Sequence, residues 1–239
     1  MISTVIPVYN TKSEWLDLAV QSILSQTFKN FEIILVDDGS TNQSTLDSLK
    51  KYDEYPNVRI IYLEKNIGIS GAINKGIKES KYNLIARMDS DDIAHSSRFQ
   101  TQFNYLYMNP RVDLVGTDVD FIEEHNGEYK RTNKLTKHPR IITREIAKES
   151  FWFINHPTVM FRKQSILDVG GYDESLKGLA EDYELWVRMI NNGKVMHNIN
   201  NTEFLLRGHS DSYTANNRNI DHLQKVQDTL RTLNKTKIK

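Results

Sequence analysis

The sequence has no cysteine, no excess of either charge and no long apolar run, and each absence excludes a class of protein. Without cysteine among 239 residues there is no disulfide framework, thiolate metal site or cysteine nucleophile, and the composition fits a reducing cytoplasm. Lys plus Arg number 31, as do Asp plus Glu, so we expect no nucleic-acid partner. No apolar run approaches the roughly 18 residues of a membrane span, and the first ten residues resemble a strand more than a signal peptide.

The first 110 residues alternate between strand and helix patterns. Short apolar runs predict strands over 3–8, 31–36, 58–63 and 84–88, and helical spacing predicts helices over 14–26, 43–51, 70–78 and 98–108. The first helix is expected to place on one face Trp15, Leu18, Ala19, Ser22, Ile23 and Gln26. This alternation predicts an α/β fold whose central, Rossmann-like and mostly parallel sheet carries helices on both faces.

The second half is less regular. Its patterns predict strands over 112–122, 158–162, 194–199 and 203–207, and helices over 140–149, 181–192 and 219–233. We expect one domain over 1–218, with halves at 1–110 and 111–218, followed by an amphipathic helix and basic tail at 219–239. That last segment could contact an anionic membrane surface, although packing on the core is the favoured interpretation.

Acidic residues follow two of the predicted strands where each ends. Asp37 and Asp38 come after the second strand, and Asp89 and Asp91 after the fourth. Because parallel sheets bind ligands beyond the carboxyl ends of their strands, both pairs should lie at one edge. Asp89-Ser90-Asp91 offers oxygen ligands for Mg²⁺ or Mn²⁺ on a diphosphate, with a solvated turn as the alternative. Asp92 is expected at a helix N-terminus.

Neighbouring residues have two interpretations each. Asp38 could accept a hydrogen bond from a uracil imide or belong to a capping turn, and Tyr9 could stack on a base or line the core. Asn66 begins a Gly-containing loop suited to phosphate. Arg87 could pair with Asp89 or with phosphate, and a structural ion pair is the favoured interpretation. Further along, the pair Glu181-Asp182 could cap a helix or supply a general base, and His209 could be a metal ligand or a surface residue.

Five motifs in order resemble those of family 2 glycosyltransferases. They are PVYN at 7–10, VDDGST at 36–41, KNIGIS with AINKG at 65–76, ARMDSDD at 86–92 and LAEDYELWVRM at 179–189. The resemblance covers about residues 1–210. It implies a GT-A fold, in which a nucleotide-binding α/β half merges with an acceptor-binding half. It also implies inverting transfer of a sugar from a nucleotide-diphosphate donor.

The resemblance assigns roles position by position. The nucleotide would be held by Pro7, Tyr9, Asp37, Asp38, Asn66 and Asp89. The Mn²⁺ or Mg²⁺ ligands would be Asp91, Asp89 and His209. Asp182 would be the general base with Glu181 in support, and the acceptor would meet His156 and Trp186. The donor is a UDP-sugar by analogy, and the acceptor a surface polysaccharide, lipid-linked oligosaccharide or protein glycan.

Two departures from the pattern of the processive members and three alternative functions limit this hypothesis. The chain lacks the Gln-x-x-Arg-Trp motif and membrane helices of processive synthases, which favours one sugar per encounter. A non-catalytic nucleotide-sugar-binding module would not need Asp182. A sugar-phosphate nucleotidyltransferase would carry a Gly-rich basic loop where Tyr9-Asn10-Thr11 stands. A phosphoacceptor signalling domain would be about half as long and would leave 179–189 unexplained.

Overall fold

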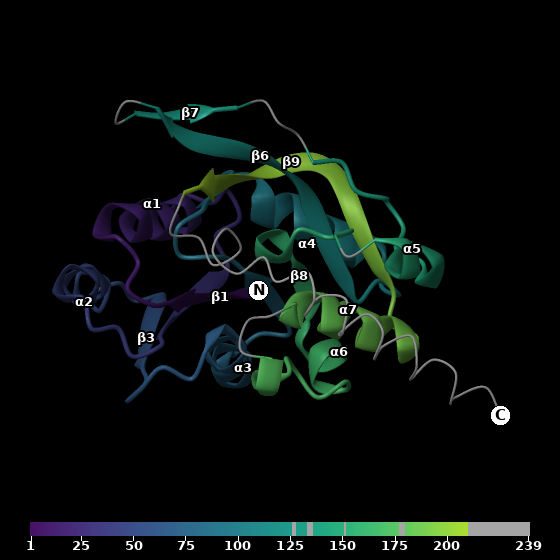
Figure 1. Cartoon of the computed structure of the whole chain (residues 1–239), viewed down its shortest axis with the longest axis horizontal. Helices are drawn as coiled ribbons and strands as arrows, with labels where there is room; N and C mark the ends of the chain where they lie inside the picture. Colours follow the sequence, from purple (N-terminus) through teal and green to yellow (C-terminus); the bar gives the residue numbers. More distant parts are fainter. Residues whose placement is uncertain (126–127, 133–135, 151, 177–179, 210–239) are drawn as a thin grey trace.

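The computed structural model describes residues 1–125, 128–132, 136–150, 152–176 and 180–209. The predicted terminal helix over 219–233, with its basic tail, lies outside these residues. One nine-stranded sheet forms the centre, in the order β3-β2-β1-β4-β8-β6-β9-β5, with β7 paired to β6 (Figure 1). Within the described ranges, no helix is both long and apolar enough to cross a bilayer.

The predicted parallel half is confirmed. Strands β1 (Ile2–Val8), β2 (Phe31–Asp37), β3 (Val58–Tyr62) and β4 (Leu84–Arg87) pair in parallel, so their carboxyl ends meet at one edge. Their crossovers contain α1 (Ser13–Leu24), α2 (Gln43–Lys50) and α3 (Ile69–Glu79), and α4 (Arg98–Met108) follows β4 and the short β5 (Ile93–Ala94). This half is the Rossmann-like sheet that the apolar runs predict.

The second half extends the sheet with mixed pairing. Strand β8 (Met160–Arg162) is antiparallel to both β4 and β6 (Leu114–His125), whereas β9 (Met196–Gly208) runs parallel to β6 and antiparallel to β5. Figure 1 shows β6 and β9 side by side as the longest strands of the fold. Helices α5 (Arg144–Glu149), α6 (Lys163–Leu167) and α7 (Glu181–Asn191) complete this half, together with β7 (Glu128–Arg131).

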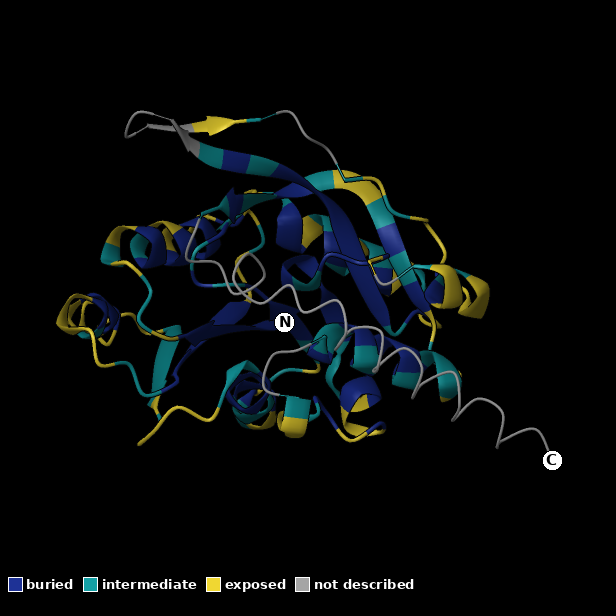
Figure 2. Cartoon of the chain, in the orientation of Figure 1, coloured by how far each residue is buried: buried dark blue, intermediate teal, exposed yellow. Residues whose placement is uncertain are grey.

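Two hydrophobic layers cover the two faces of the sheet. Alternate residues of one strand point to opposite faces. In β2, Ile33 and Leu35 pack with α1, α2 and α4, whereas Ile34 and Val36 pack with α3, α6 and α7. Figure 2 shows the resulting pattern, with buried strands at the centre and exposed residues on the outer surfaces of the helices. Both layers continue into the second half, which makes it part of the same core.

Two predicted boundaries and one predicted buried residue are wrong. The two strands expected over 194–199 and 203–207 are one strand, because β9 follows β6 through register shifts. The helix expected over 140–149 begins at Arg144, where the Thr143 hydroxyl caps the N–H of Ile146 at 3.3 Å. The expected inward residue Leu18 is 46% exposed. Its neighbours Leu16 and Val20 are buried instead.

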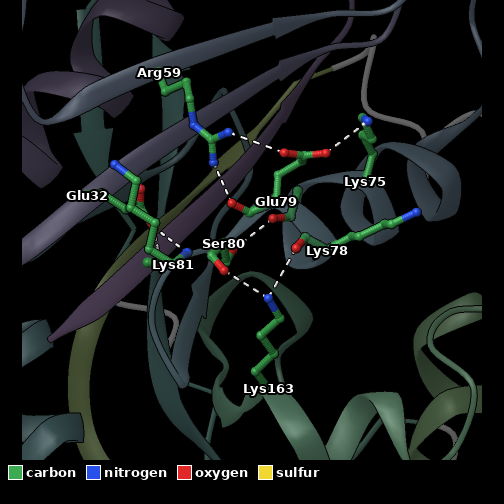
Figure 3. Close-up of polar contacts among 10 residues, drawn as sticks. Glu32, Arg59, Lys75, Lys78, Glu79, Ser80, Lys81 and Lys163 are labelled. Carbon is green, nitrogen blue, oxygen red and sulfur yellow. Dashed lines mark hydrogen bonds and ion pairs between the residues drawn. The ribbon is translucent and has the colours of Figure 1, made fainter.

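A polar cluster holds the end of α3 at the edge of the sheet opposite the acidic pairs (Figure 3). The ammonium of Lys163, at the start of α6, donates to the carbonyls of Lys78 and Ser80 at 3.1 and 2.8 Å. Those carbonyls have no partner within the last turn of a helix, and a cation there also complements the helix dipole. Arg59 of β3 reaches the carboxylate of Glu79 at 3.3 Å. Residues of both halves therefore fix α3 against the sheet.

The close packing of α3 on β1 generates a prediction. A Cβ at Gly76 would collide with Cγ1 of Val5 in the central strand β1, whereas a Cβ at Gly71 would meet only the side chain of the partly exposed Ile67, with Cδ1 nearest at 2.8 Å. Gly76→Ala should destabilise the protein by about 2 kcal/mol through overpacking. Gly71→Ala is the matched control and should stay within about 1 kcal/mol of the original, because alanine favours a helix. Urea unfolding measures both, and equal effects would contradict the packing argument.

Candidate active site at the carboxyl edge of the sheet

Asp38 ties the end of β2 to the loop before α3. Its carboxylate oxygens accept the backbone N–H groups of Ile67 at 2.7 Å and Gly68 at 3.0 Å. Gly39, at φ +70°, lies so close to this loop that a Cβ would be 2.7 Å from the nitrogen of Asn66. A carboxylate has about four lone-pair positions, so Asp38 keeps acceptor capacity for a ligand. The VDDG and KNIG motifs therefore form one joined structure.

The loop after β1 is joined to the same structure. Asn10, at φ 50°, accepts the N–H groups of Thr41 and Asn42 through its side-chain oxygen at 2.8 and 2.9 Å. Pro7 is buried in β1, whereas Tyr9 is 51% exposed, so its ring is available to a flat ligand. Asp37 is buried and accepts the N–H of Ser40 at 3.2 Å, which is the turn interpretation of this residue.

Asn66 and Asp89 both have partners within the protein. The side chain of Asn66 is exposed and accepts the N–H of Gly68 at 3.1 Å. Asp89 forms the expected ion pair with Arg87, whose guanidinium contacts both carboxylate oxygens at 2.7 and 2.5 Å. The side chain of Arg87 is 1% exposed, whereas that of Asp89 is 30% exposed. Asp89 therefore faces the edge of the sheet while its charge is balanced from behind.

Asp91 and Asp92 meet the end of β9. The N–H of Arg207 donates to Asp92 at 2.8 Å, and the guanidinium of Arg207 donates to the carbonyl of Asp91 at 2.7 Å. Nε2 of His209 lies 2.9 Å from Oδ2 of Asp91. The prediction that Asp92 lies at the start of a helix is therefore wrong. Asp92 precedes β5, whose pairing with β9 brings His209 to the acidic loop.

The residues present fit a divalent cation. Carboxylate oxygens of Asp89, Asp91 and Asp92 lie within 4.8 Å of one another. Nε2 of His209 and Oδ2 of Asp91 are 2.9 Å apart. Two adjacent ligand atoms of an octahedral ion with bonds near 2.1 Å are about 3 Å apart, so this separation also fits a metal. Asp92 is buried and bonded to Arg207, and Asp89 is paired with Arg87. Asp91 and His209 are therefore the side chains best placed to ligate a metal.

The acids of the LAEDYEL motif begin α7. Glu181 is buried, and its carboxylate lies 3.7 Å from Nδ1 of His156. Burial, reinforced by Asp182, raises the pKa of Glu181 to about 7. Burial likewise raises the pKa of Asp182, against the backbone N–H of Tyr183 and the charge of Arg87. The α7 acids, Arg87 and Asp89 are close enough to shift one another's pKa, so the two motifs meet in one site.

His156 lies behind these acids and is largely buried. Its Nε2 lies 2.9 Å from the hydroxyl of Tyr172, and burial lowers its pKa well below the usual value, so the ring is neutral. Trp186 packs edge-on against His156 and is 1% exposed. This burial argues against the acceptor contact that we expected of Trp186. The ring instead supports His156 from the hydrophobic core.

Two contributors have no signal in the sequence. Tyr172 reaches His156, and its backbone is held by the Asn74 side chain of α3 at 2.9 Å. Trp15 of α1 contacts the ring of His209 with centroids 4.5 Å apart. Both contacts join residues that are distant in the sequence, and periodicity only marked Trp15 as a core residue. All predicted site residues except Trp186 lie around the carboxyl edge of the sheet.

Comparisons with known proteins agree on one family. A family model described as glycosyl transferase family 2 matches residues 3–170. The O-antigen biosynthesis glycosyltransferase WbnJ of Escherichia coli is 36% identical over 80% of this chain and 72% of its own length. The amylovoran biosynthesis glycosyltransferase AmsE of Erwinia amylovora is 33% identical over 88% of this chain and 77% of its own.

One further relative has a name that specifies its substrates, and one solved structure shows the same fold. The UDP-Gal:alpha-D-GlcNAc-diphosphoundecaprenol beta-1,3-galactosyltransferase of Escherichia coli is 31% identical over 75% of this chain and 63% of its own length. The structure of S. aureus TarS 1–349 with UDP superposes with a TM-score of 0.72 at 20% identity, covering 97% of this chain and 64% of the TarS 1–349 chain. The GT-A fold is confirmed, and the nucleotidyltransferase and signalling-domain alternatives are not supported.

The raised pKa of Glu181 predicts a pH-dependent stability. Between its usual value of 4.5 and about 7, the folded protein holds a proton that the unfolded chain releases, so stability falls as pH rises through this window. Glu181→Gln removes that loss and should be more stable than the original at pH 8 by about 3 kcal/mol, with the gain vanishing below pH 4.5.

Urea unfolding at several pH values measures this difference. The control is Glu149→Gln, because the side chain of Glu149 lies in solvent at the end of α5. A gain for Glu181→Gln that is the same at every pH would show that the carboxyl does not titrate in this window.

Proposed function

The chain belongs to glycosyl transferase family 2 and is a glycosyltransferase, and on this premise we propose that it transfers one sugar per encounter from a UDP-sugar to a saccharide acceptor, with inversion, in polysaccharide biosynthesis. The observation that carries the proposal is the meeting of two acidic motifs at one edge of the sheet. Asp91 lies beside His209 there, and the negative charge of Asp89 contributes to the raised pKa of Asp182.

The donor nucleotide is proposed to lie along the loops after β1 and β2. Exposed Tyr9 stacks on the base beside Pro7, and Asp38 accepts from the base imide with the lone pairs that Ile67 and Gly68 leave. Asp37 supports this loop, Asn66 adds a polar contact, and Asp89 meets the ribose or a metal-bound water. A UDP donor is supported by the UDP and UDP-GlcNAc complexes of TarS, which shares the fold.

Asp91 and His209 are proposed to hold Mn²⁺ or Mg²⁺ next to the diphosphate. When bound, such an ion neutralises charge that develops on the departing diphosphate. Trp15 packs against His209, and Arg207 fixes the backbone of Asp91, so both ligands are held before donor binding. Preorganised ligands lose less freedom when the ion binds.

Asp182 is proposed as the general base. It accepts the proton of the acceptor hydroxyl on the side of the sugar opposite the leaving group, which produces inversion. Its raised pKa makes it a better proton acceptor than an exposed carboxylate, while the charge of Arg87 favours its ionised form. Glu181 and neutral His156 orient the acceptor hydroxyl beside it.

The acceptor is proposed to be a lipid-linked saccharide. The support is the name of the E. coli relative, which specifies a sugar diphosphoundecaprenol as its acceptor. An acceptor of this kind would place the reaction in the cytoplasm at the inner face of the membrane. Contact of 219–239 with that membrane, which is the alternative to packing on the core, belongs to this proposal as well.

Asp182→Asn tests the base assignment. The amide keeps the shape of the side chain and cannot accept the proton, so kcat should fall on the order of 10²-fold or more while KM for the UDP-sugar stays the same. Asp168→Asn is the control, because Asp168 forms a surface ion pair with Lys194. UDP release from a panel of UDP-sugars and saccharide acceptors measures both. An unchanged rate in Asp182→Asn would refute the assignment, and binding of UDP-sugars without turnover would favour the non-catalytic module.

His209→Ala tests the metal site. Activity should be lost on chelation and restored by Mn²⁺ or Mg²⁺, and the variant should need about tenfold or more Mn²⁺ for half-maximal rate, because one ligand is missing. His95→Ala is a matched control, since the side chain of His95 is 60% exposed beside β5. Full activity in the chelator would contradict a metal-dependent reaction.

A further inference from the structure

A second polar cluster lies at the same edge of the sheet, where β6 extends beyond its partner β8. Phe161 of β8 pairs with Ile85 of β4 on one side and with Leu114 of β6 on the other. Counting equally along both strands, from 85 to 87 and from 114 to 116, places the end of β4 level with Gly116, two residues before Asp118. The two strands are two spacings apart, or about 10 Å. Asp118 therefore lies on a strand about that far from the strand that leads into the acidic loop.

Asp118 has an unusual environment for a carboxylate. The residue is 6% exposed, and its Oδ1 accepts a hydrogen bond from no residue that the structure describes. Its carboxylate does accept the backbone N–H of His138. Buried polar atoms almost always have a partner, so an orphan oxygen at a functional edge indicates a ligand that donates to it.

The alternation of β6 sets the side on which this carboxylate lies. Leu114 packs with the layer of α3 and α7, whereas Val115 and Val119 pack with the opposite layer. Asp118 has the same parity as Leu114 and so faces the layer of α7, which carries Glu181 and Asp182.

A chain of contacts joins this cluster to the proposed base. Nε2 of His138 lies 3.1 Å from the side-chain oxygen of Asn155, whose nitrogen donates to the carbonyl of Thr117 at 2.9 Å. The next residue, His156, faces Glu181. Phe153 packs edge-on against Tyr183, the residue after Asp182. The segment over 152–156 therefore runs between the cluster and the start of α7.

Trp152 places an aromatic surface at the outer end of this segment. Its ring is perpendicular to that of His138, with centroids 5.3 Å apart, and the residue is 54% exposed. The hydroxyl of Ser150 bonds both the N–H and the carbonyl of Trp152, at 3.2 and 3.0 Å. The other two tryptophans, Trp15 and Trp186, are 4% and 1% exposed. Trp152 is thus held in place although it lies in solvent.

We propose that Trp152, His138 and Asp118 form a subsite that binds a sugar ring of the acceptor next to the one that reacts. The C–H face of a pyranose packs on the exposed indole, its hydroxyls donate to the free oxygen of Asp118, and neutral His138 orients the indole. Burial lowers the pKa of His138, which favours the neutral form of its ring. The inference rests on the proposed function, because it names the part of the acceptor that this edge recognises.

Fluorine NMR of the full chain labelled with 5-fluorotryptophan tests binding directly. The probes are methyl glucosides, galactosides, N-acetylglucosaminides and N-acetylgalactosaminides, together with lactose and chitobiose, each titrated in the presence of UDP and Mn²⁺. The resonance that disappears in Trp152→Phe is that of Trp152. It should move with at least one saccharide, while those of buried Trp15 and Trp186 stay fixed. If no probe moves it, the subsite is refuted.

Steady-state kinetics separate this subsite from the reaction itself. Trp152→Ala should raise KM for a saccharide acceptor about tenfold, Trp152→Tyr should restore most of the loss, and hydrolysis of the UDP-sugar without acceptor should be unchanged. Tyr107→Ala is the matched control, since Tyr107 is 75% exposed and packs against Phe103 on α4. An unchanged acceptor KM in Trp152→Ala refutes the subsite. Absence of UDP-sugar hydrolysis and transfer in the original protein would instead refute the proposed function.

Discussion

The site depends on one buried positive charge. Arg87 is 1% exposed, binds both oxygens of Asp89, and acts electrostatically on Glu181 and Asp182. Without it, burial and mutual repulsion would raise the pKa of these carboxyls further. Its own carbonyl is held by the guanidinium of Arg98 at 2.7 Å, and Arg98 is fully buried as well. A basic residue at the end of a central strand thus lets acids from two distant motifs share one edge.

The loops of this edge are held by side chains that bind the backbone of another loop. Asp38 binds the N–H groups before α3, Asn10 binds those after β2, and Asp92 binds that of Arg207. Each bond satisfies backbone groups that would otherwise need water. The same residues that the motifs contribute therefore build the site as well as line it. Preorganisation of this kind would let the proposed donor bind with little loss of freedom.

The first half of the fold could be predicted because its signals are local. Continuous apolar runs such as FEIILV at 31–36 mark buried strands, and the acids that follow them fall at the ligand edge. In the second half, β5 is only two residues long and β9 takes its length from β6, so their boundaries depend on distant partners. Tyr172 and the burial of Trp186 depend on tertiary contacts, which periodicity along one helix does not reveal.

The place of β9 in the sheet has a consequence for biosynthesis. Among the strands that the structure describes, β9 comes last in the chain, yet it lies between β6 and β5 and leads to His209 beside Asp91. During translation, the strands and loops of the parallel half leave the ribosome before His209 does. If Asp91 and His209 hold a cation as proposed, a nascent chain completes that site only after the loops proposed to bind the nucleotide, so synthesis of β9 couples completion of the sheet to completion of the site.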